Sequence, residues 1–282
     1  NGAATLYYPL WHYEVEDLLV LKNNKGTEDN RVRHMDYGVQ FNKLMYERLM
    51  TGGNITLFSP HDVPGLYDAF FADQDEFKRL YEQAERNTSI RKKTISATEL
   101  FSSFMQERKD TGRIYLQNVD HANSHSSFKT DVAPIKQSNL CCEIDLPTKP
   151  LNDVKDPDGE IALCTLSAIN WGIFRNPQDM EKACTLAVRG LDALLSYQNY
   201  PIIAAQMATE NRRPLGIGII NLAFFLAKYD VSYSDPTALN LVDTWAQHWS
   251  YYLIKASADL AVEFGACPKN HETKYSDGVL PV

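Results

Sequence analysis

The sequence has no long hydrophobic run, and this absence excludes a membrane-spanning helix. Its longest apolar stretch extends from Gly216 to Ala227 and is interrupted by Asn221, whereas a helix needs about 20 apolar residues to cross a bilayer. An initiator Met is also absent, and the first residues lack the basic start and apolar region of a signal peptide. We therefore expect no membrane association, and both ends look as if they were cut from a longer protein.

Cysteine is scarce, with five residues and no CxxC pair. An odd count without regular spacing excludes a disulfide framework and predicts reduced thiols in a cytoplasmic protein. Positive charge is also in deficit, and the net charge of −8 argues against a surface for direct nucleic-acid binding. The remaining composition, 44% hydrophobic and 23% charged, is that of a globular chain long enough for a sizeable buried core.

Local patterns predict an alternation of strands and helices, which is typical of the α/β class. Strands are expected where short β-rich runs stand between turns, and helices where apolar residues recur every three or four positions. A polar loop is expected over 120–137. The predicted strands cover 55–58, 113–119 and 160–166, and the predicted helices cover about 12–21, 38–50, 66–86, 94–109, 176–197, 216–229 and 237–264.

Two short motifs have both a functional and an ordinary interpretation. Gly216 and Gly218 form a GxG pattern, but Asn221 occupies the position where a dinucleotide-binding fingerprint has glycine, so a helix start packed against a strand is favoured. His121 and His125 are four residues apart, but no Glu follows the first histidine and the stretch favours turns. We therefore predict no metal site.

The stretch from Gln137 to Pro150, in the middle of the chain, carries the most informative combination of residues. Asn139, Cys141 and Glu143 occupy alternate positions, and an extended segment would place them on one face. The ordinary interpretation is a polar turn leading into a strand, with the cysteines as small apolar fillers. Against it, a thiol beside a carboxylate and an amide is costly to bury without a purpose.

The neighbouring carboxylate also decides which thiol chemistry is favoured at Cys141. A negative charge nearby raises the pKa of a thiol, and a thiolate nucleophile prefers an electropositive setting. The pattern therefore favours a neutral S–H group, whose hydrogen atom can be removed to give a thiyl radical.

Longer motifs around this stretch resemble one enzyme family. The segments Ser138–Thr148 and Glu160–Asn170 strongly resemble the catalytic large subunit of class I (aerobic) ribonucleotide reductase, and so do Arg33–Gln40, Leu57–Leu66 and Gly112–Tyr115. The resemblance covers nearly the whole chain and is strongest to the bacterial and phage form that reduces diphosphates. It implies part of a ten-stranded α/β barrel with a central loop that carries the radical cysteine at its tip. Residues 1–282 would then be one partial catalytic barrel domain.

The resemblance also implies roles for individual residues. Cys141 matches the thiyl-radical cysteine that abstracts the ribose 3′ hydrogen, and Glu143 matches the general base that takes the 3′-hydroxyl proton. Asn139 matches the residue that hydrogen-bonds the ribose hydroxyls. Cys164 matches one of the two cysteines that supply reducing equivalents and end as a disulfide. Residues 1–136 contain no cysteine, so its partner is expected upstream of this chain.

The whole run from Asn139 to Glu143, including Leu140, is implied to bind the substrate. Cys142 departs from the family pattern, in which an apolar residue is expected here. By alternation its side chain would point away from the substrate, and we interpret it as a packing residue. The water-poor barrel interior that a thiyl radical needs is expected to surround this run.

The same resemblance implies partners and ligands outside this chain. A metal-containing small subunit would supply the radical, thioredoxin or glutaredoxin would reduce the disulfide, and a second large subunit would complete a homodimer. The substrate would be a ribonucleoside diphosphate. Nucleoside triphosphate effectors (ATP or dNTP) would bind in an N-terminal region that precedes this chain, and the C-terminal part of the barrel would follow it, so no cofactor is expected within the chain itself.

Two other interpretations stay open at this stage. The chain could be a non-catalytic structural or interaction fragment of a split or truncated reductase gene; whether another chain or the rest of the gene supplies the missing segments would decide this. It could also be a related glycyl-radical enzyme, although no glycyl-radical motif is visible.

Overall fold

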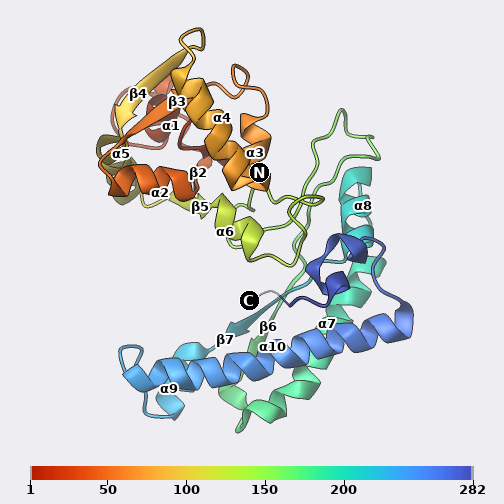
Figure 1. The fold of residues 1–282 in the computed structure, drawn as a ribbon. Helices are drawn as coiled ribbons and strands as arrows, with labels where there is room; N and C mark the ends of the chain where they lie inside the picture. Colours follow the sequence, from red (N-terminus) through yellow and green to blue (C-terminus); the bar gives the residue numbers. More distant parts are fainter. Residues whose placement is uncertain (1, 281–282) are drawn as a thin grey trace. The chain divides into compact units, whose positions relative to one another are not determined.

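The computed structural model describes residues 2–280, and the chain divides into two compact units (Figure 1). Unit 1 extends to Thr148 and also includes the segment from Glu272 onward, whereas unit 2 is Lys149–His271. The predicted α/β class is confirmed by the mixture of helices and parallel strands. The prediction that residues 1–282 are one partial barrel domain is not tested by this division and stays a prediction.

Unit 1 is built around a parallel sheet in which strand β2 lies between β1 and β5, and a separate antiparallel pair joins β3 and β4. The strands are β1 (Thr5–Pro9), β2 (Asp36–Phe41), β3 (Asn54–Phe58), β4 (Lys92–Ser96) and β5 (Ile114–Asn118). The helices are α1 (Val15–Leu19), α2 (Lys43–Met50), α3 (Leu66–Ala72), α4 (Gln74–Arg86), α5 (Ala97–Thr111) and α6 (Val119–Ser124), with short 3-10 helices η1 (Glu28–Asn30) and η5 (Lys274–Asp277).

The parallel sheet has an apolar face and a polar face, because side chains alternate along each strand. Residues paired across a parallel sheet share a face, and the register pairs Tyr7 with Gly38, Gly38 with Tyr115, and Gln40 with Gln117. On the opposite face most side chains are buried in the core of the unit, among them Tyr8, Tyr37, Val39, Phe41 and Ile114, whereas Leu6 is exposed. We call the first set the polar face of the sheet; it comprises Thr5, Tyr7, Gly38, Gln40, Tyr115 and Gln117.

The core of unit 1 is rich in aromatic side chains. Trp11 is fully buried and contacts Phe70 and Phe77, with ring centroids 5.6 and 5.9 Å apart. Each such ring covers about 150–250 Å² of surface, so a few of them supply much of the apolar burial of a small unit. Because this core includes the apolar face of the sheet, the polar face is left for contacts with other segments.

Three predicted helices were wrong in their first residues, where the structure has strands. Residues 38–41 belong to β2, 94–96 to β4 and 216–220 to β7, and a helix follows each strand after at most one residue. A short apolar strand beside a helix cannot be separated from it by periodicity alone. Asn42 marks one boundary, since its side chain caps α2 by accepting a hydrogen bond from the N–H of Met45 (3.4 Å).

Other predictions for unit 1 succeeded or needed a smaller change. The strands predicted at 55–58 and 113–119 are confirmed as β3 and β5. The single helix predicted over 66–86 is two helices, because the carboxylate of Asp73 accepts hydrogen bonds from the N–H groups of the next helix's first turn (both 3.0 Å). The polar loop predicted over 120–137 begins with helix α6.

Unit 2 packs helices against a two-stranded parallel sheet, in which β6 (Leu166–Asn170) pairs with β7 (Gly216–Ile220). Its core joins Trp171, Phe225 and Trp245, whose ring centroids lie 4.7–5.9 Å apart. The helices are α7 (Glu181–Tyr197), α8 (Ile203–Arg212), α9 (Leu222–Lys228) and α10 (Pro236–Phe264), with 3-10 helices η2 (Trp171–Ile173), η3 (Pro177–Met180) and η4 (Asn270–Glu272).

Helices α7 and α10 confirm two predicted helices, whereas α8 had not been predicted. Helix α10 is 29 residues long. Within residues 2–280, however, no helix combines the length and the apolar character that crossing a membrane requires.

A buried ionic cluster around Glu160 organises the start of unit 2. The Glu160 side chain is 5% exposed and accepts hydrogen bonds from Arg212 Nε (2.8 Å) and from Lys269. Burial by itself would raise the pKa of this carboxyl, but the hydrogen bonds and charges of Arg212 and Lys269 outweigh burial and lower the pKa. Glu160 is therefore held ionised between cations.

The same residue explains why the strand predicted over 160–166 was wrong. The backbone of Glu160 pairs with Lys149 (3.1 Å), and the N–H of Ile161 donates to Ala204 O in α8 (3.2 Å). These contacts direct the segment to a loop and a helix, so residues 161–165 are irregular and β6 begins only at Leu166.

We predict that Glu160→Gln lowers the free energy of unfolding of unit 2 by about 3 kcal/mol at pH 7, because it removes the buried carboxylate charge that pairs with Arg212 and Lys269. A lowered carboxyl pKa stabilises the fold above the unfolded value of about 4.3, and this stabilisation is lost as the pH falls through the folded pKa. The difference between variant and wild type should therefore shrink at acid pH in urea unfolding.

The matched control is Glu263→Gln, because Glu263 accepts two hydrogen bonds from Arg189 at an exposed site. This substitution should change stability by less than about 1 kcal/mol. Equal losses for the two variants, or a Glu160→Gln defect that does not depend on pH, would contradict the assignment.

Candidate functional site

Residues 136–146 form a tight hairpin-like loop, which we call the central loop. An isolated antiparallel bridge joins Ser138 to Asp145, and the N–H of Cys142 donates to Asn139 O (3.2 Å) to close the turn between them. Cys142 has a left-handed backbone with φ of 67°, a conformation that residues other than glycine rarely adopt. Cys141 lies in the turn and is exposed.

The side chain of Asn139 holds this turn together. Its Oδ1 accepts hydrogen bonds from the N–H groups of Glu143 (3.0 Å) and Ile144 (3.1 Å). The prediction that Asn139, Cys141 and Glu143 share one face of an extended segment was therefore wrong. The physical reason is that an asparagine oxygen can satisfy backbone donors within a turn. For the backbone, the ordinary interpretation is correct in one respect, because the segment forms a polar turn.

Two side chains of β1 anchor the tip of the central loop. Thr5 Oγ1 donates to Leu140 O (2.6 Å), and the Tyr7 hydroxyl donates to Asn139 O (2.7 Å). Tyr7 can lie across the sheet because its neighbour in the register is Gly38: a Cβ there would be 2.4 Å from two carbons of the tyrosine ring. The polar face of the sheet thus supplies hydrogen-bond donors to the loop backbone.

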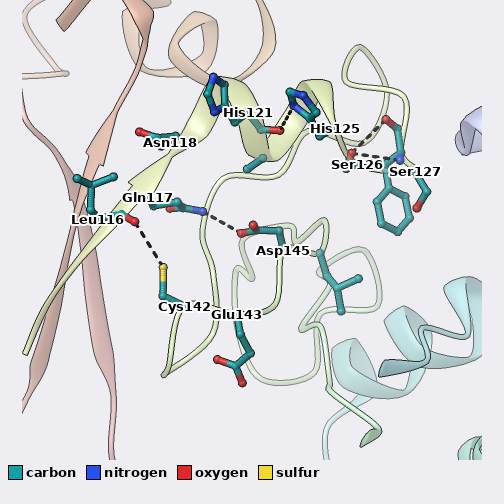
Figure 2. Close-up of a pocket in the computed structure, with 13 residues that line it drawn as sticks. Leu116, Gln117, Asn118, His121, His125, Ser126, Ser127, Cys142, Glu143 and Asp145 are labelled. Atoms are coloured by element: carbon teal, nitrogen blue, oxygen red, sulfur yellow. Dashed lines mark hydrogen bonds between the residues drawn. The ribbon is translucent and has the colours of Figure 1, made fainter. Parts of the chain in front are cut away.

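A hollow of about 490 Å³ lies beside the central loop (Figure 2). The loop contributes Cys142, Glu143 and Asp145 to its wall, whereas Cys141 is not a lining residue. The left-handed backbone of Cys142 breaks the alternation on which its predicted orientation was based, and both Cys142 and Glu143 line the hollow. That Cys142 points away from the substrate stays a prediction. The other lining residues are Leu116, Gln117, Asn118, His121, Ala122, His125, Ser126, Ser127, Phe128 and Leu146.

The thiol of Cys142 lies in a setting that keeps it neutral. Figure 2 shows its Sγ directed to Leu116 O, 4.0 Å away. Burial raises the pKa of this thiol, the negative charges of Asp145 and Glu143 raise it further, and hydrogen bonding to Tyr7 acts in the opposite direction. Loss of solvation also raises the pKa of the Asp145 carboxyl, although that residue keeps an exposed surface.

The histidine pair lies at helix α6, with His121 inside the helix and His125 as its C-cap, and not in the turn that had been predicted. His121 and His125 are one helical turn apart, with ring centroids 5.5 Å from each other. Over residues 2–280, the structure contains no group of three or more His, Cys, Asp or Glu residues arranged to hold a metal ion. The pair is a polar part of the hollow's wall.

Cys164, the predicted redox cysteine, lies in unit 2, in the irregular segment before β6, and is exposed. Its role as one of two cysteines that supply reducing equivalents, with a partner upstream of this chain, stays a prediction. The remaining cysteines differ in their surroundings: Cys184 is buried in α7, and burial raises its pKa to about 11, whereas Cys267 is half-buried.

Sequence patterns had not identified the residues that hold the loop. Thr5, Tyr7, Gln40 and Gln117 all lie on the polar face of the sheet, and each makes a hydrogen bond to the central loop. The alternation of polar and apolar residues in β1, β2 and β5 could have identified them. In β2 this alternation was not recognised, because residues of the strand had been included in a predicted helix.

Comparison with known proteins gives one consistent result. A protein-family model described as "Ribonucleotide reductase, barrel domain" matches residues 1–282. The ribonucleoside-diphosphate reductase subunit alpha of Haemophilus influenzae is 61% identical over 282 residues. The corresponding proteins are 63% identical over 282 residues in Escherichia coli, and 53% identical over 286 residues in Enterobacteria phage T4. Each match covers 100% of this chain but 37% of the relative, so the chain spans little more than a third of these proteins.

We predict that alkylation of Cys142 has a pH midpoint above that of an ordinary thiol, because burial and nearby carboxylates disfavour its thiolate. Replacing Asp145 with Asn should lower the midpoint, since it removes one of the negative charges that raise the pKa. Peptide mass spectrometry in a Cys141→Ser background would follow Cys142 alone in the central loop. Asp75→Asn, which changes an exposed carboxylate on α4, is the control and should leave the midpoint unchanged. A wild-type midpoint at or below the ordinary value would contradict this description.

Proposed function

This chain belongs to the ribonucleotide reductase family, and from that premise we propose that it is the central part of the catalytic large subunit of a ribonucleoside-diphosphate reductase. Its reaction would be the radical reduction of ribonucleoside diphosphates to 2′-deoxyribonucleoside diphosphates, which DNA synthesis requires. The observation that carries the proposal is the central loop, which presents Asn139, Cys141 and Glu143 around one turn.

Cys141 is proposed as the residue that removes the 3′ hydrogen atom of the ribose. Its exposed position in the turn, directly after two residues whose carbonyl groups are anchored by Thr5 and Tyr7, suits a group that must reach a bound sugar. A thiyl radical also needs shielding from water. The proposal therefore requires that further protein covers Cys141 in the active enzyme.

Asn139 is proposed to hydrogen-bond the ribose hydroxyls through one end of its amide. Its Oδ1 is occupied by the N–H groups of Glu143 and Ile144. Its Nδ2 makes no hydrogen bond to other residues within 2–280, so two N–H donors remain for a ligand. The local hydrogen bonds would orient those donors, and the same side chain would serve the turn and the substrate.

Glu143 is proposed as the general base that takes the proton of the 3′-hydroxyl, which helps the 2′-hydroxyl to leave as water. A base must come within about 2.6–3.2 Å of the group that it deprotonates. Glu143 is exposed, lines the hollow, and has its backbone N–H fixed by Asn139. Leu140 and Cys142 complete the proposed substrate-binding run between these residues.

The reducing equivalents would come from Cys164 and a second cysteine upstream of this chain, which would end as a disulfide. Thioredoxin or glutaredoxin would then reduce that disulfide in the cytoplasm. A separate metal-containing small subunit would supply the radical to Cys141, and the large subunit would form a homodimer. Nucleoside triphosphate effectors would bind outside this chain.

We predict that Cys141→Ser abolishes formation of deoxyribonucleoside diphosphate in a reductase assembly containing this chain, because a hydroxyl does not replace the thiol in hydrogen-atom abstraction. Nucleotide binding should be retained, and calorimetry would measure it alongside turnover. The control is Cys267→Ser, which should keep turnover. Retained product formation by Cys141→Ser would exclude the proposal and favour a non-catalytic fragment.

A second prediction separates the two uses of Asn139. Asn139→Asp keeps an oxygen that can accept from the N–H groups of Glu143 and Ile144 but removes the amide donors, whereas Asn139→Ala removes both. The Asp variant should keep wild-type amide hydrogen exchange in the central loop yet lose turnover by about 10- to 100-fold, and the Ala variant should lose both. An Asp variant with full turnover would show that the donors are not used.

A further inference from the structure

We propose that Gln40 and Gln117 are positioning residues for Cys141, because together they form a buried amide clamp that holds both stems of the central loop on the polar face of the sheet. This inference rests on the proposed function, since it concerns the placement of the residue that would carry the radical. The two glutamines would act on Cys141 only through the loop.

The strand register brings the two side chains together. Gln40 of β2 is paired with Gln117 of β5. Gln40 Nε2 donates to Gln117 Oε1 (2.9 Å) and to Lys136 O (2.7 Å), where the chain enters the loop. Gln117 Nε2 donates to Asp145 Oδ1 (3.1 Å), where the chain leaves it (Figure 2). Two side chains from adjacent strands thus connect the two stems of one loop.

The chain of hydrogen bonds has one direction. A carbonyl at Lys136 and a carboxylate at Asp145 can only accept, so Gln40 and Gln117 must each present an N–H to the loop. Gln40 then uses its second N–H for Gln117, which must turn its oxygen to Gln40. Reversing either amide would oppose two acceptors or two donors, so the partners fix both side-chain orientations.

Burial makes this arrangement rigid. Gln40 is 1% exposed and Gln117 is 4% exposed, so water does not compete freely for their amides. A buried amide that loses its partner costs free energy, and a network in a setting of low polarity is stronger than its exposed counterpart. Displacing either stem of the loop would therefore leave at least one buried amide group without a partner.

The clamp and the tip contacts act at two levels of the same loop. Thr5 and Tyr7 hold the turn itself, whereas the glutamines hold the stems several residues away. If the stems moved, the turn would tilt with them and Cys141 would shift relative to the sugar. A misplacement of about 1 Å can cost about 100-fold in rate even when the chemical groups are unchanged.

The test exchanges the donor and the acceptor of the hydrogen bond between Gln117 and Asp145, in a reductase assembly containing this chain. In Gln117→Glu the new carboxylate still accepts from Gln40 but repels Asp145. We expect kcat to fall by about 10- to 100-fold with KM for the diphosphate nearly unchanged. When Asp145→Asn is added, the new amide at position 145 can donate to the new carboxylate at position 117. The hydrogen bond then runs in the reverse direction with the native net charge, and most of the lost kcat should be recovered.

Two further variants serve as controls. Asp145→Asn alone keeps an oxygen for Gln117 Nε2 and should stay close to wild type, which would show that the hydrogen bond matters more than the charge of Asp145. Gln106→Glu makes the matched substitution at an exposed glutamine, whose Nε2 donates to Asp110 Oδ1 (2.8 Å) on α5, and should leave kcat unchanged. Wild-type kcat in Gln117→Glu, or a double variant as defective as the single one, would overturn the clamp.

Amide hydrogen exchange over 137–146 in the same assembly provides a readout that does not depend on turnover. Exchange should be faster in Gln117→Glu and return to the wild-type rate in the double variant. A fall in kcat with unchanged exchange would also overturn the clamp. If the wild-type assembly reduces no ribonucleotide, the proposed function fails while exchange still tests the clamp. If Gln117→Glu does not fold, Gln117→Met replaces it and should show the same loss of kcat and faster exchange.

Discussion

The structure of unit 1 depends on how the central loop satisfies its backbone polar groups. Carbonyl groups that leave solvent need donors, and here three side chains of one sheet provide them: Thr5 to Leu140, Tyr7 to Asn139 and Gln40 to Lys136. The sheet can do this because its other face is buried in an aromatic core. The division of one sheet into two faces therefore both stabilises the unit and holds the proposed radical-bearing turn.

Carboxylates in the two units illustrate how environment assigns roles to one residue type. Glu160 is buried between Arg212 and Lys269, and these cations lower its pKa, which makes it a fixed anion within unit 2. Glu143 instead is exposed beside a hollow, and its backbone N–H donates to Asn139 Oδ1. A carboxylate that is already bonded to cations cannot easily exchange a proton with a ligand, whereas an exposed one can approach it.

Local sequence patterns predicted elements well where a periodic segment stood alone, as for α7, α10, β3 and β5. They failed where a strand of five or six residues precedes a helix almost directly, because apolar residues such as Val39 or Ile219 fit either pattern over so short a length. They also failed at 161–165, where Glu160 and Ile161 bond to a loop and to α8 instead of to a strand. In each case a contact outside the segment decided its conformation.

The sequence by itself determined the family, the α/β class and the candidate residues Asn139, Cys141, Glu143 and Cys164, because long motifs and residue types are local information. Only the tertiary structure decided that Asn139 commits its oxygen to the turn, that Cys142 lines the hollow, and that side chains of β1, β2 and β5 hold the loop. The physical reason is separation along the chain: Thr5 and Tyr7 bond to residues 135 and 132 positions away. Such partners meet only after the sheet has formed, and no local spacing records them.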